Sequence, residues 1–215
     1  MKGIKLIIYL LANPKRLKAL MLLNNKSYLQ ETGWLNSYIS KESIDGNGSP
    51  IPEFTYPFID FIVERLNKDL YVFEYDSGNS THFYSRYTSK IISLEHDKKK
   101  YHEHYNSLPD NSELYFCDLD RDGNYCRFAN KLGKKFDLVS IAGRDRLNCC
   151  KQALNILTEK GVIVLNDSNK IQVKEASNFL HDNGFKEISF IGLSPRNHHT
   201  TATSVFYKPL NCLSI

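Results

Sequence analysis

From about residue 70 onward, apolar runs alternate with helical patterns along the chain. Runs rich in Ile, Val, Leu, Phe and Tyr predict strands near residues 70–75, 90–95, 113–117, 136–141 and 161–165. Between the last two strands, residues 148–159 predict a helix that Lys160 and Gly161 would close. Strands that alternate with helices indicate a parallel sheet with right-handed crossovers.

The C-terminal part of the chain breaks this alternation. A helix predicted over residues 172–182 and closed by Asn183 and Gly184 is followed by strands at 185–191 and 203–208, with no helix between them. Two strands joined by a loop must pair antiparallel if they are neighbours. The pattern therefore predicts an α/β, Rossmann-like fold with a seven-stranded, mostly parallel sheet and an antiparallel C-terminal hairpin.

The N-terminal part has a different pattern. It is predicted to be helical up to about Ser43, and the turn formers at 45–50 must break any helix. A further helix is indicated by apolar residues at three- and four-residue steps, namely Phe58, Phe61, Ile62 and Leu66. We therefore expect a helical N-terminal extension or lid at 1–50 and a Rossmann-like domain at 51–215.

Two N-terminal segments bear on contact with a membrane. Residues 4–12 are apolar, but this run is too short to span a bilayer and lacks a small-residue cleavage site, so neither a signal peptide nor a spanning helix is expected. Residues 14–23 predict a basic amphipathic helix. We expect this helix to pack on the domain, and contact with a membrane or a membrane-bound partner is the alternative.

Composition narrows the class of protein. The 215 residues are 41% hydrophobic and 24% charged, which suits one globular domain with an extension. The net charge is +4, but acids interrupt the Lys and Arg residues, so nucleic acid is not an expected partner. The five cysteines lack C-x-x-C spacing, which predicts reduced thiols and a cytoplasmic location.

Two acids and a small-residue turn mark a candidate nucleoside site. Glu74 lies at the end of the first predicted strand, the turn 77–80 follows it, and Glu95 ends the second strand. In a strand, turn, helix and strand unit, this spacing brings the backbone N–H groups of the turn and the second carboxylate to one edge of the sheet. A nucleoside with a charged tail fits such an edge.

This arrangement resembles the class I S-adenosylmethionine-dependent methyltransferases over residues 54–215. Five segments carry a narrower similarity, namely EYDSGNST, SLEHD, FDLVSIAGRDR, VIVLNDS and SPRNHHTTATSVFY. They are similar to a small methyltransferase-like family of bacterial glycan and O-antigen clusters, and also to macrocin-type sugar O-methyltransferases. The resemblance implies S-adenosylmethionine as cofactor and a small-molecule or glycan acceptor, while SGNST lacks the three-glycine fingerprint of nicotinamide dehydrogenases.

The resemblance also implies roles for individual residues. Glu74, Gly78 and Ser80 match the motif whose turn wraps the methionine part of the cofactor. Glu95 matches the acid that binds both ribose hydroxyls, and the alternative is a solvated strand-end carboxylate. Asp118 stands where such enzymes contact the adenine, and it is equally compatible with a turn former.

Asp76 replaces the first glycine of this motif, next to Ser77, and both residues are expected to lie against the cofactor. Glycine is favoured there because the chain bends tightly with no side chain beside the ligand. If the Asp76 carboxylate lay ~4 Å from a like charge, the repulsion at an effective dielectric of about 20 would cost on the order of 4 kcal/mol. If it faced the cofactor's ammonium group instead, the interaction would be attractive. We therefore expect weak cofactor binding.

The predicted reaction site departs from the family as well. In macrocin-type relatives, carboxylates at the ends of the fourth and fifth strands hold a divalent metal beside the acceptor oxygen. This chain has Ala142 and Asn166 at those positions, so a weak or absent metal site is expected. The remaining oxygen donors are Asp167 and Asp145. Asp167 is a candidate base or ligand, or else a turn or helix-cap residue.

Further polar residues follow the later strands. His198, beside His199, lies in the loop between the last two strands and is a candidate general base, although histidines in such loops are more often exposed. Arg144 and Arg146 suit a phosphate or sugar-linked anion, or an ion-paired helix start.

Two hypotheses follow from these patterns. The first is an O-methyltransferase that acts on a sugar or glycan hydroxyl. The second is a non-catalytic protein that keeps the fold for binding or assembly, as the departures from the family indicate, namely Asp76, Ala142, Asn166 and Asn169. The sequence leaves a homo-oligomer open.

Overall fold

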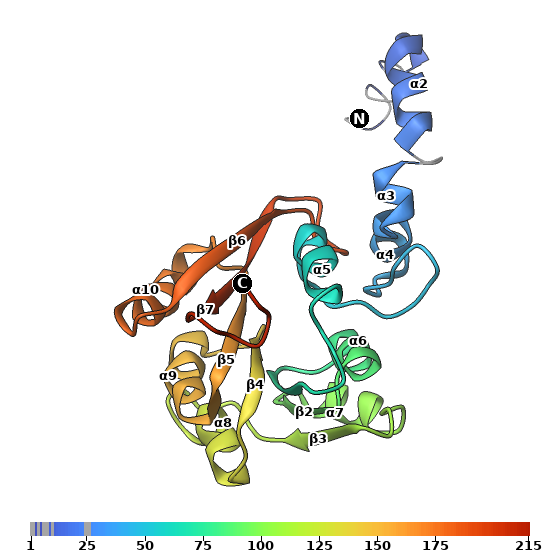
Figure 1. Cartoon of the computed structure of the whole chain (residues 1–215). Helices are drawn as coiled ribbons and strands as arrows, with labels where there is room; N and C mark the ends of the chain where they lie inside the picture. Colours follow the sequence, from blue (N-terminus) through green and yellow to red (C-terminus); the bar gives the residue numbers. More distant parts are fainter. Residues whose placement is uncertain (1–2, 4, 6–8, 10, 24–26) are drawn as a thin grey trace.

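The computed structural model describes residues 3, 5, 9, 11–23 and 27–215 (Figure 1). In this part of the chain seven strands form one sheet in the order β3-β2-β1-β4-β5-β7-β6. Each pairing is parallel except those of β7, which runs antiparallel to β5 and β6. The predicted mostly parallel sheet with a C-terminal hairpin is confirmed. The strands are β1 Tyr71–Tyr75, β2 Lys90–Glu95, β3 Ser112–Phe116, β4 Phe136–Ile141, β5 Leu157–Asn166, β6 Lys186–Gly192 and β7 Thr201–Tyr207.

Helices cover both faces of the sheet. They are α5 Tyr56–Val63, α6 Asn79–Tyr87, α7 Lys98–Tyr105, α8 Asn124–Arg127, α9 Arg146–Ile156 and α10 Lys174–Asp182, with short 3₁₀ turns at Phe128–Leu132 and Ile171–Val173. Because successive side chains of a strand point to opposite faces, the sheet supplies two cores. Phe73 and Val139 pack toward α8, α9 and α10, whereas Val72 and Leu138 pack toward α5 and α6.

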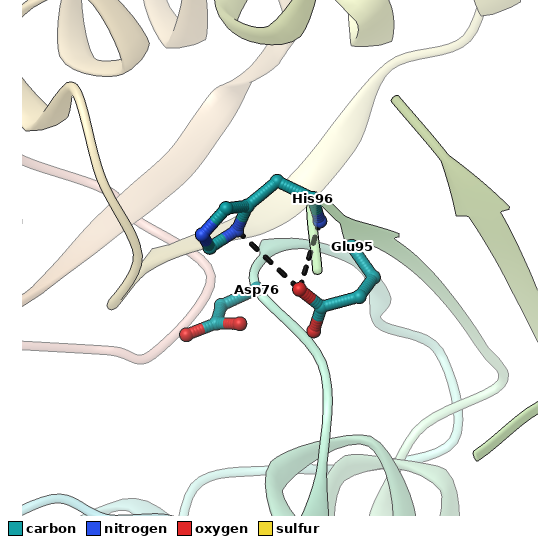
Figure 2. A group of neighbouring side chains, drawn as sticks. All are labelled: Asp76, Glu95 and His96. Atoms are coloured by element: carbon teal, nitrogen blue, oxygen red, sulfur yellow. Dashed lines mark hydrogen bonds and ion pairs between the residues drawn. The ribbon is translucent and has the colours of Figure 1, made fainter. Parts of the chain in front are cut away.

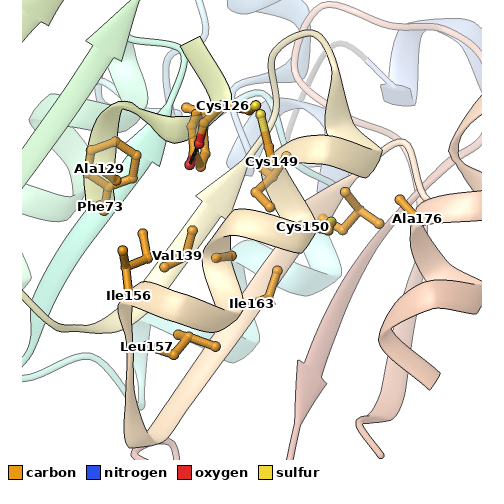
Figure 3. Close-up of a cluster of buried hydrophobic side chains, with 14 of the residues drawn as sticks. Phe73, Cys126, Ala129, Val139, Cys149, Cys150, Ile156, Leu157, Ile163 and Ala176 are labelled. Carbon is orange, nitrogen blue, oxygen red and sulfur yellow. Dashed lines mark hydrogen bonds between the residues drawn. The ribbon is translucent and has the colours of Figure 1, made fainter. Parts of the chain in front are cut away.

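Three cysteines of α8 and α9 point into the core (Figure 3). Cys126, Cys149 and Cys150 are completely buried beside Phe73 and Val139. Burial raises the pKa of the Cys150 thiol, because the apolar surroundings disfavour the thiolate. All five cysteines of the chain are free thiols, so these three act as small apolar side chains.

The helix after β4 ends earlier than predicted. α9 stops at Ile156, and Thr158 and Glu159 belong to β5. Gly161 does not cap a helix, since it lies within this strand, where the register against β4 shifts. A Cβ on Gly161 would stand 3.0 Å from Leu157 Cβ and 3.1 Å from the Phe136 carbonyl oxygen, which leaves little room for a side chain.

The N-terminal helical pattern is divided into α2 Pro14–Leu23, α3 Tyr28–Glu31 and α4 Trp34–Ser40. α2 forms over the predicted residues, but it stands away from the sheet next to α3 (Figure 1). The expectation that it packs on the domain is therefore wrong. The apolar run 4–12 lies largely outside the described residues, and among those described no helix is long and apolar enough to cross a bilayer.

Residues 33–54, which we call the N-terminal strap, are fastened to the main domain by side-chain hydrogen bonds. Trp34 Nε1 donates to the Asn197 carbonyl oxygen at 2.7 Å, and Asn79 Nδ2 donates to the Ser43 carbonyl oxygen at 2.7 Å. The strap thus reaches the loop between β6 and β7 at one end and α6 in its middle. The division of the chain at residue 50 stays a prediction.

Gly33→Ala is expected to detach the strap. Gly33 has φ +82, and a Cβ there would stand 2.2 Å from the Asp45 carbonyl carbon, which is backbone and cannot move aside. Gly48→Ala is the matched control, because Gly48 has φ +83 and open space around it, so only the positive-φ cost of about 1 kcal/mol remains. Trp34 is the single tryptophan, so its fluorescence reports the strap directly. Equal effects of both variants would contradict this prediction.

Candidate functional site

Glu74 is buried at the carboxyl end of β1, where it joins three elements. Its carboxylate accepts a hydrogen bond from Ser93 Oγ of β2 at 2.6 Å and another from Thr81 Oγ1 of α6. Burial raises the pKa of Glu74 to about 7, and the hydroxyls of Ser93, Thr81 and Ser80 offset only part of this effect. Glu74 therefore fixes the turn after β1 against the sheet and exchanges a proton near neutral pH.

The turn after β1 has the backbone conformation that favours glycine. Gly78 has φ +149, and Asp76 has φ +91 although it carries a side chain. A non-glycine residue in such a region costs on the order of 1–3 kcal/mol. Asp76 thus adopts a strained conformation at the position where the resembling family has glycine.

Glu95 is completely buried at the end of β2, and hydrogen-bond donors of the chain surround its carboxylate. Oε1 accepts from the N–H groups of His96 at 2.8 Å and Asp97 at 2.7 Å, while Oε2 accepts from Ser77 Oγ at 2.8 Å and more weakly from its N–H. Burial alone would raise the pKa of Glu95, but the Asp97 N–H and the Ser77 hydroxyl hold it below its ordinary value. Glu95 is therefore ionised and already paired.

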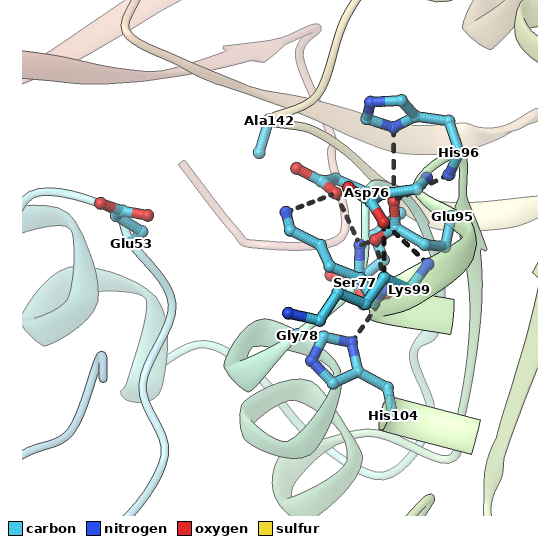
Figure 4. A network of polar contacts seen from close by, with 12 residues as sticks. Glu53, Asp76, Ser77, Gly78, Glu95, His96, Lys99, His104 and Ala142 are labelled. Carbon is cyan, nitrogen blue, oxygen red and sulfur yellow. Dashed lines mark hydrogen bonds and ion pairs between the residues drawn. The ribbon is translucent and has the colours of Figure 1, made fainter. Parts of the chain in front are cut away.

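Asp76 and Glu95 form a pair of neighbouring carboxyl groups (Figure 4). Burial raises the pKa of Asp76 to about 7, and the negative charge of Glu95 adds to this rise, while Lys100 Nζ, 3.8 Å from Asp76 Oδ1, opposes it. Two carboxylates this close favour one shared proton. Asp76 therefore keeps its proton to a higher pH than an isolated aspartate does.

The same edge holds a possible set of metal ligands that the sequence analysis missed. Asp76, Glu95 and His96 place three ligand atoms within 4.8 Å of one another (Figure 2). However, the oxygens of Glu95 already accept hydrogen bonds from backbone N–H groups, and His96 Nδ1 lies 3.3 Å from Glu95 Oε1. We assign no metal to this cluster, because proton sharing accounts for the contact between its carboxyl groups.

Two clefts meet at Asp76 along the carboxyl edge of the sheet. The first has a volume of about 870 Å³ and is lined by His96, Gly143 and Asp145 among others. The second has a volume of about 440 Å³ and runs under the strap past Glu53 and Gly78. Figure 4 shows Glu53 on a segment separate from the Asp76 network.

The predicted site residues divide between these clefts. Asp145 lines the first cleft, and Asp76 and Asp167 line both. The second cleft includes Glu74, Ser77, Gly78 and Ser80. In the described part of the chain, three predicted residues line neither cleft, namely Glu95, Asp118 and His198.

Comparisons with solved structures find the same architecture. A precorrin-6y C5,15-methyltransferase of Geobacter metallireducens has a TM-score of 0.56 and 18% identity, covering 70% of this chain and 87% of its own. A candidate methyltransferase of Streptococcus mutans in complex with S-adenosylhomocysteine has a TM-score of 0.52 and 15% identity over 74% of this chain and 100% of its own. A tRNA (m1A58) methyltransferase of Aquifex aeolicus has a TM-score of 0.50 and 14% identity, covering 73% of this chain and 70% of its own. The chain has the class I methyltransferase fold. No protein-family model and no curated protein matches the sequence.

In this methyltransferase fold, Asp167 follows β5 and is fully engaged in ion pairs. Its Oδ2 lies 3.2 Å from Arg146 Nη2 and 2.8 Å from Lys170 Nζ, and its Oδ1 accepts from Thr201 Oγ1 at 2.8 Å. Burial alone would raise the pKa of Asp167, but Lys170, Thr201 and Arg146 hold it below its ordinary value. Asp167 is therefore a poor proton acceptor near neutral pH.

Asn166 has a structural explanation within the methyltransferase fold. Its Nδ2 donates to the Glu53 carbonyl oxygen at 3.1 Å, and its Oδ1 accepts from Thr203 Oγ1 at 3.1 Å. A carboxylate at this position has no N–H to donate to Glu53. Asn166 thus joins the strap to β5 and β7.

The remaining candidates are less closely tied to the two clefts. Asp118 is exposed, and His198 packs edge-on to Tyr38 with ring centroids 6.2 Å apart. Sequence reasoning missed Lys100 and His104, which line the second cleft from α7. Their signal was available, since Asp97 is a good N-cap and places α7 directly after Glu95.

Proposed function

We propose that the protein is an S-adenosylmethionine-dependent methyltransferase that acts on a hydroxyl group of a sugar or glycan. The observation that carries this proposal is the position of Glu95 at the end of β2, where it binds Ser77 of the Gly78 turn and adjoins His96 and Asp97, which line the 870 Å³ cleft. The fold supports the activity class, and the S-adenosylhomocysteine bound to the Streptococcus mutans protein supports the cofactor. The sugar acceptor rests on the sequence resemblance alone.

Gly78 and the charge of Glu95 fit an adenosyl cofactor, whereas Asp76 and the hydrogen bonds that Glu95 already accepts oppose it. Gly78, at φ +149, leaves the start of α6 free of a side chain, and Glu95 is an ionised acceptor suited to ribose hydroxyls. Asp76 does not fit, since its carboxyl group lies against Glu95 and must move or lose its contact before a ribose can bind. When bound, the cofactor would supply an activated methyl group on a sulfonium centre.

The chain's own residues orient ligands rather than provide an evident base. Asp167 holds Arg146 and Lys170 between the two clefts, where these cations suit an anionic or polar acceptor. Arg144 lines the first cleft without an ion pair among the described residues, which adds to this positive character. The acceptor hydroxyl is therefore expected to depend on alignment with the methyl donor.

A non-catalytic binding protein is the second candidate function, and one observation favours it. The carboxylate of Glu95 is saturated by Ser77, His96 and Asp97 and adjoins the carboxyl group of Asp76. A nucleoside must therefore compete with bonds that the chain already makes. On this hypothesis the clefts bind a ligand without methyl transfer.

Isothermal titration with S-adenosylmethionine and S-adenosylhomocysteine tests the cofactor, and transfer of labelled methyl to sugar acceptors tests the reaction. We expect binding weaker than micromolar that Glu95→Gln weakens further by about 10-fold, because a charge-assisted acceptor is lost. Glu113→Gln is the matched control, since Glu113 is a carboxylate of the neighbouring strand β3 that pairs with Lys90 and Lys134 rather than with the turn that holds Gly78. Binding without transfer would favour the second function. Glu95→Gln with an unchanged dissociation constant would reject the ribose role.

A further inference from the structure

The positive charge of the chain is concentrated at its N-terminus. The first 30 residues contain six of the 28 Lys and Arg residues and none of the 24 acids, the first of which is Glu31. The rest of the chain is therefore net negative by two charges, although the whole chain is net +4. We call residues 1–30 the basic arm.

The described part of the basic arm exposes apolar side chains on α2 and just before it. Leu11 is 64% exposed, Leu20 44%, Met21 62% and Leu22 59%. Figure 1 shows α2 standing away from the sheet, so the body of the protein does not cover them. Leu20 and Met21 lie near one another on one side of α2, where adjacent exposed apolar groups indicate a binding site, whereas Leu22 falls on the side of Lys15 and Lys18.

Basic and apolar side chains alternate around α2. Lys15 and Lys18 lie three residues apart and share one side of the helix, whereas Leu17, Leu20 and Met21 recur at three- and four-residue steps on another. Within the described residues, no acid forms an ion pair with the basic side chains of α2. The helix therefore presents unneutralised cations beside exposed apolar groups.

We propose that the basic arm docks α2 on an anionic phospholipid surface. Such a surface meets both features at once, because lipid phosphates neutralise Lys15, Arg16 and Lys18 while the acyl boundary buries Leu20 and Met21. Pairing with a second copy fits less well, since its arm would bring further positive charge and no acid, and the rest of its chain carries only two net negative charges. The ten residues of α2 span about 15 Å, which suits a helix lying in the interface rather than crossing the bilayer.

This proposal is independent of the proposed function, because it uses no residue of either cleft. Co-sedimentation of the full chain with phosphatidylcholine vesicles, with and without phosphatidylglycerol, tests it. We expect binding only when phosphatidylglycerol is present and release at high salt, since the attraction is screened within a Debye length. Equal binding to both vesicles, or no binding to either, would overturn the proposal.

Matched variants separate this docking from general basicity. Replacing Lys15, Arg16 and Lys18 together with Gln is expected to weaken binding to the anionic vesicles roughly 100-fold. The control carries the same charge change on the main domain, at Lys131, Lys134 and Lys135, and is expected to bind like the unmodified chain. Leu20→Ser with Met21→Ser is expected to weaken binding even at low salt.

Two measurements keep these variants interpretable. Retained Trp34 fluorescence shows that the strap and the domain below it remain folded, because Trp34 lies outside the arm. Light scattering without lipid reports association between copies. A dimer that Leu20→Ser and Met21→Ser abolish would overturn the proposal, since the apolar face would then be covered by a second chain.

Discussion

Urea unfolding is expected to require a higher denaturant concentration at about pH 5 than at about pH 8. The pKa values of Glu74 and Asp76 are raised to about 7 from ordinary values of 4.5 and 3.8. Between about pH 4 and pH 7 the folded state therefore keeps protons that the unfolded state has released. Stability falls as the pH rises through this window and levels off above about pH 7. Glu74 alone corresponds to about 3 kcal/mol, and Asp76 acts in the same direction.

Other groups set the limits of this pH effect. Glu95 and Asp167 have lowered pKa values, so the stability they contribute is present above their unfolded pKa values and is lost only in more acidic solution. His82 acts against the trend below about pH 6.5, because burial lowers its pKa and the folded state resists protonation. Glu74→Gln and Asp76→Asn should each flatten the dependence. A midpoint that rises from about pH 5 to about pH 8 would contradict the raised pKa values.

Asp76→Gly is expected to tighten S-adenosylhomocysteine binding by about 10- to 100-fold, because it frees Glu95 from a neighbouring carboxyl group. The variant also places glycine at φ +91, where a side chain is strained, so stability is expected to rise rather than fall. Titration calorimetry on both proteins measures the first effect, and urea unfolding measures the second. An unchanged or weaker affinity would show that Asp76 assists the ligand.

Two controls assign this gain to its cause. Asp76→Asn removes the charge but keeps a side chain at the strained backbone, so it separates electrostatics from strain. Ser214→Gly makes a comparable replacement at φ +57 in a residue that lines neither cleft. It is expected to change stability slightly and affinity not at all.

The order and type of most elements were predictable because buried strands and amphipathic helices leave periodic patterns. The end of α9 could not be predicted, because Lys160 and Gly161 are typical helix-capping residues, whereas in the structure this segment pairs with β4. The position of α2 could not be predicted either, since a helical pattern does not say which surface, if any, a helix covers.

For the candidate site, the backbone conformation could be predicted from the sequence, whereas the hydrogen bonds between side chains could not. The unusual backbone of Asp76 followed from its place in a glycine motif, and the structure has φ +91 there. The closure of Glu95 by Ser77 and His96 was not foreseen, because a hydrogen-bond network depends on rotamers rather than on spacing. Asn166 likewise looked like a lost ligand, whereas its amide joins the strap to the sheet.

The strap has a consequence for how this molecule can diversify. The second cleft is walled on one side by Glu53 and Asn197, which come from the strap and the loop after β6, and on the other by the turn after β1. Segments without a place in the sheet tolerate insertion and replacement better than strands do. Substitutions in the strap can therefore change which ligand the second cleft prefers, while the edge formed by β1 and β2 is retained.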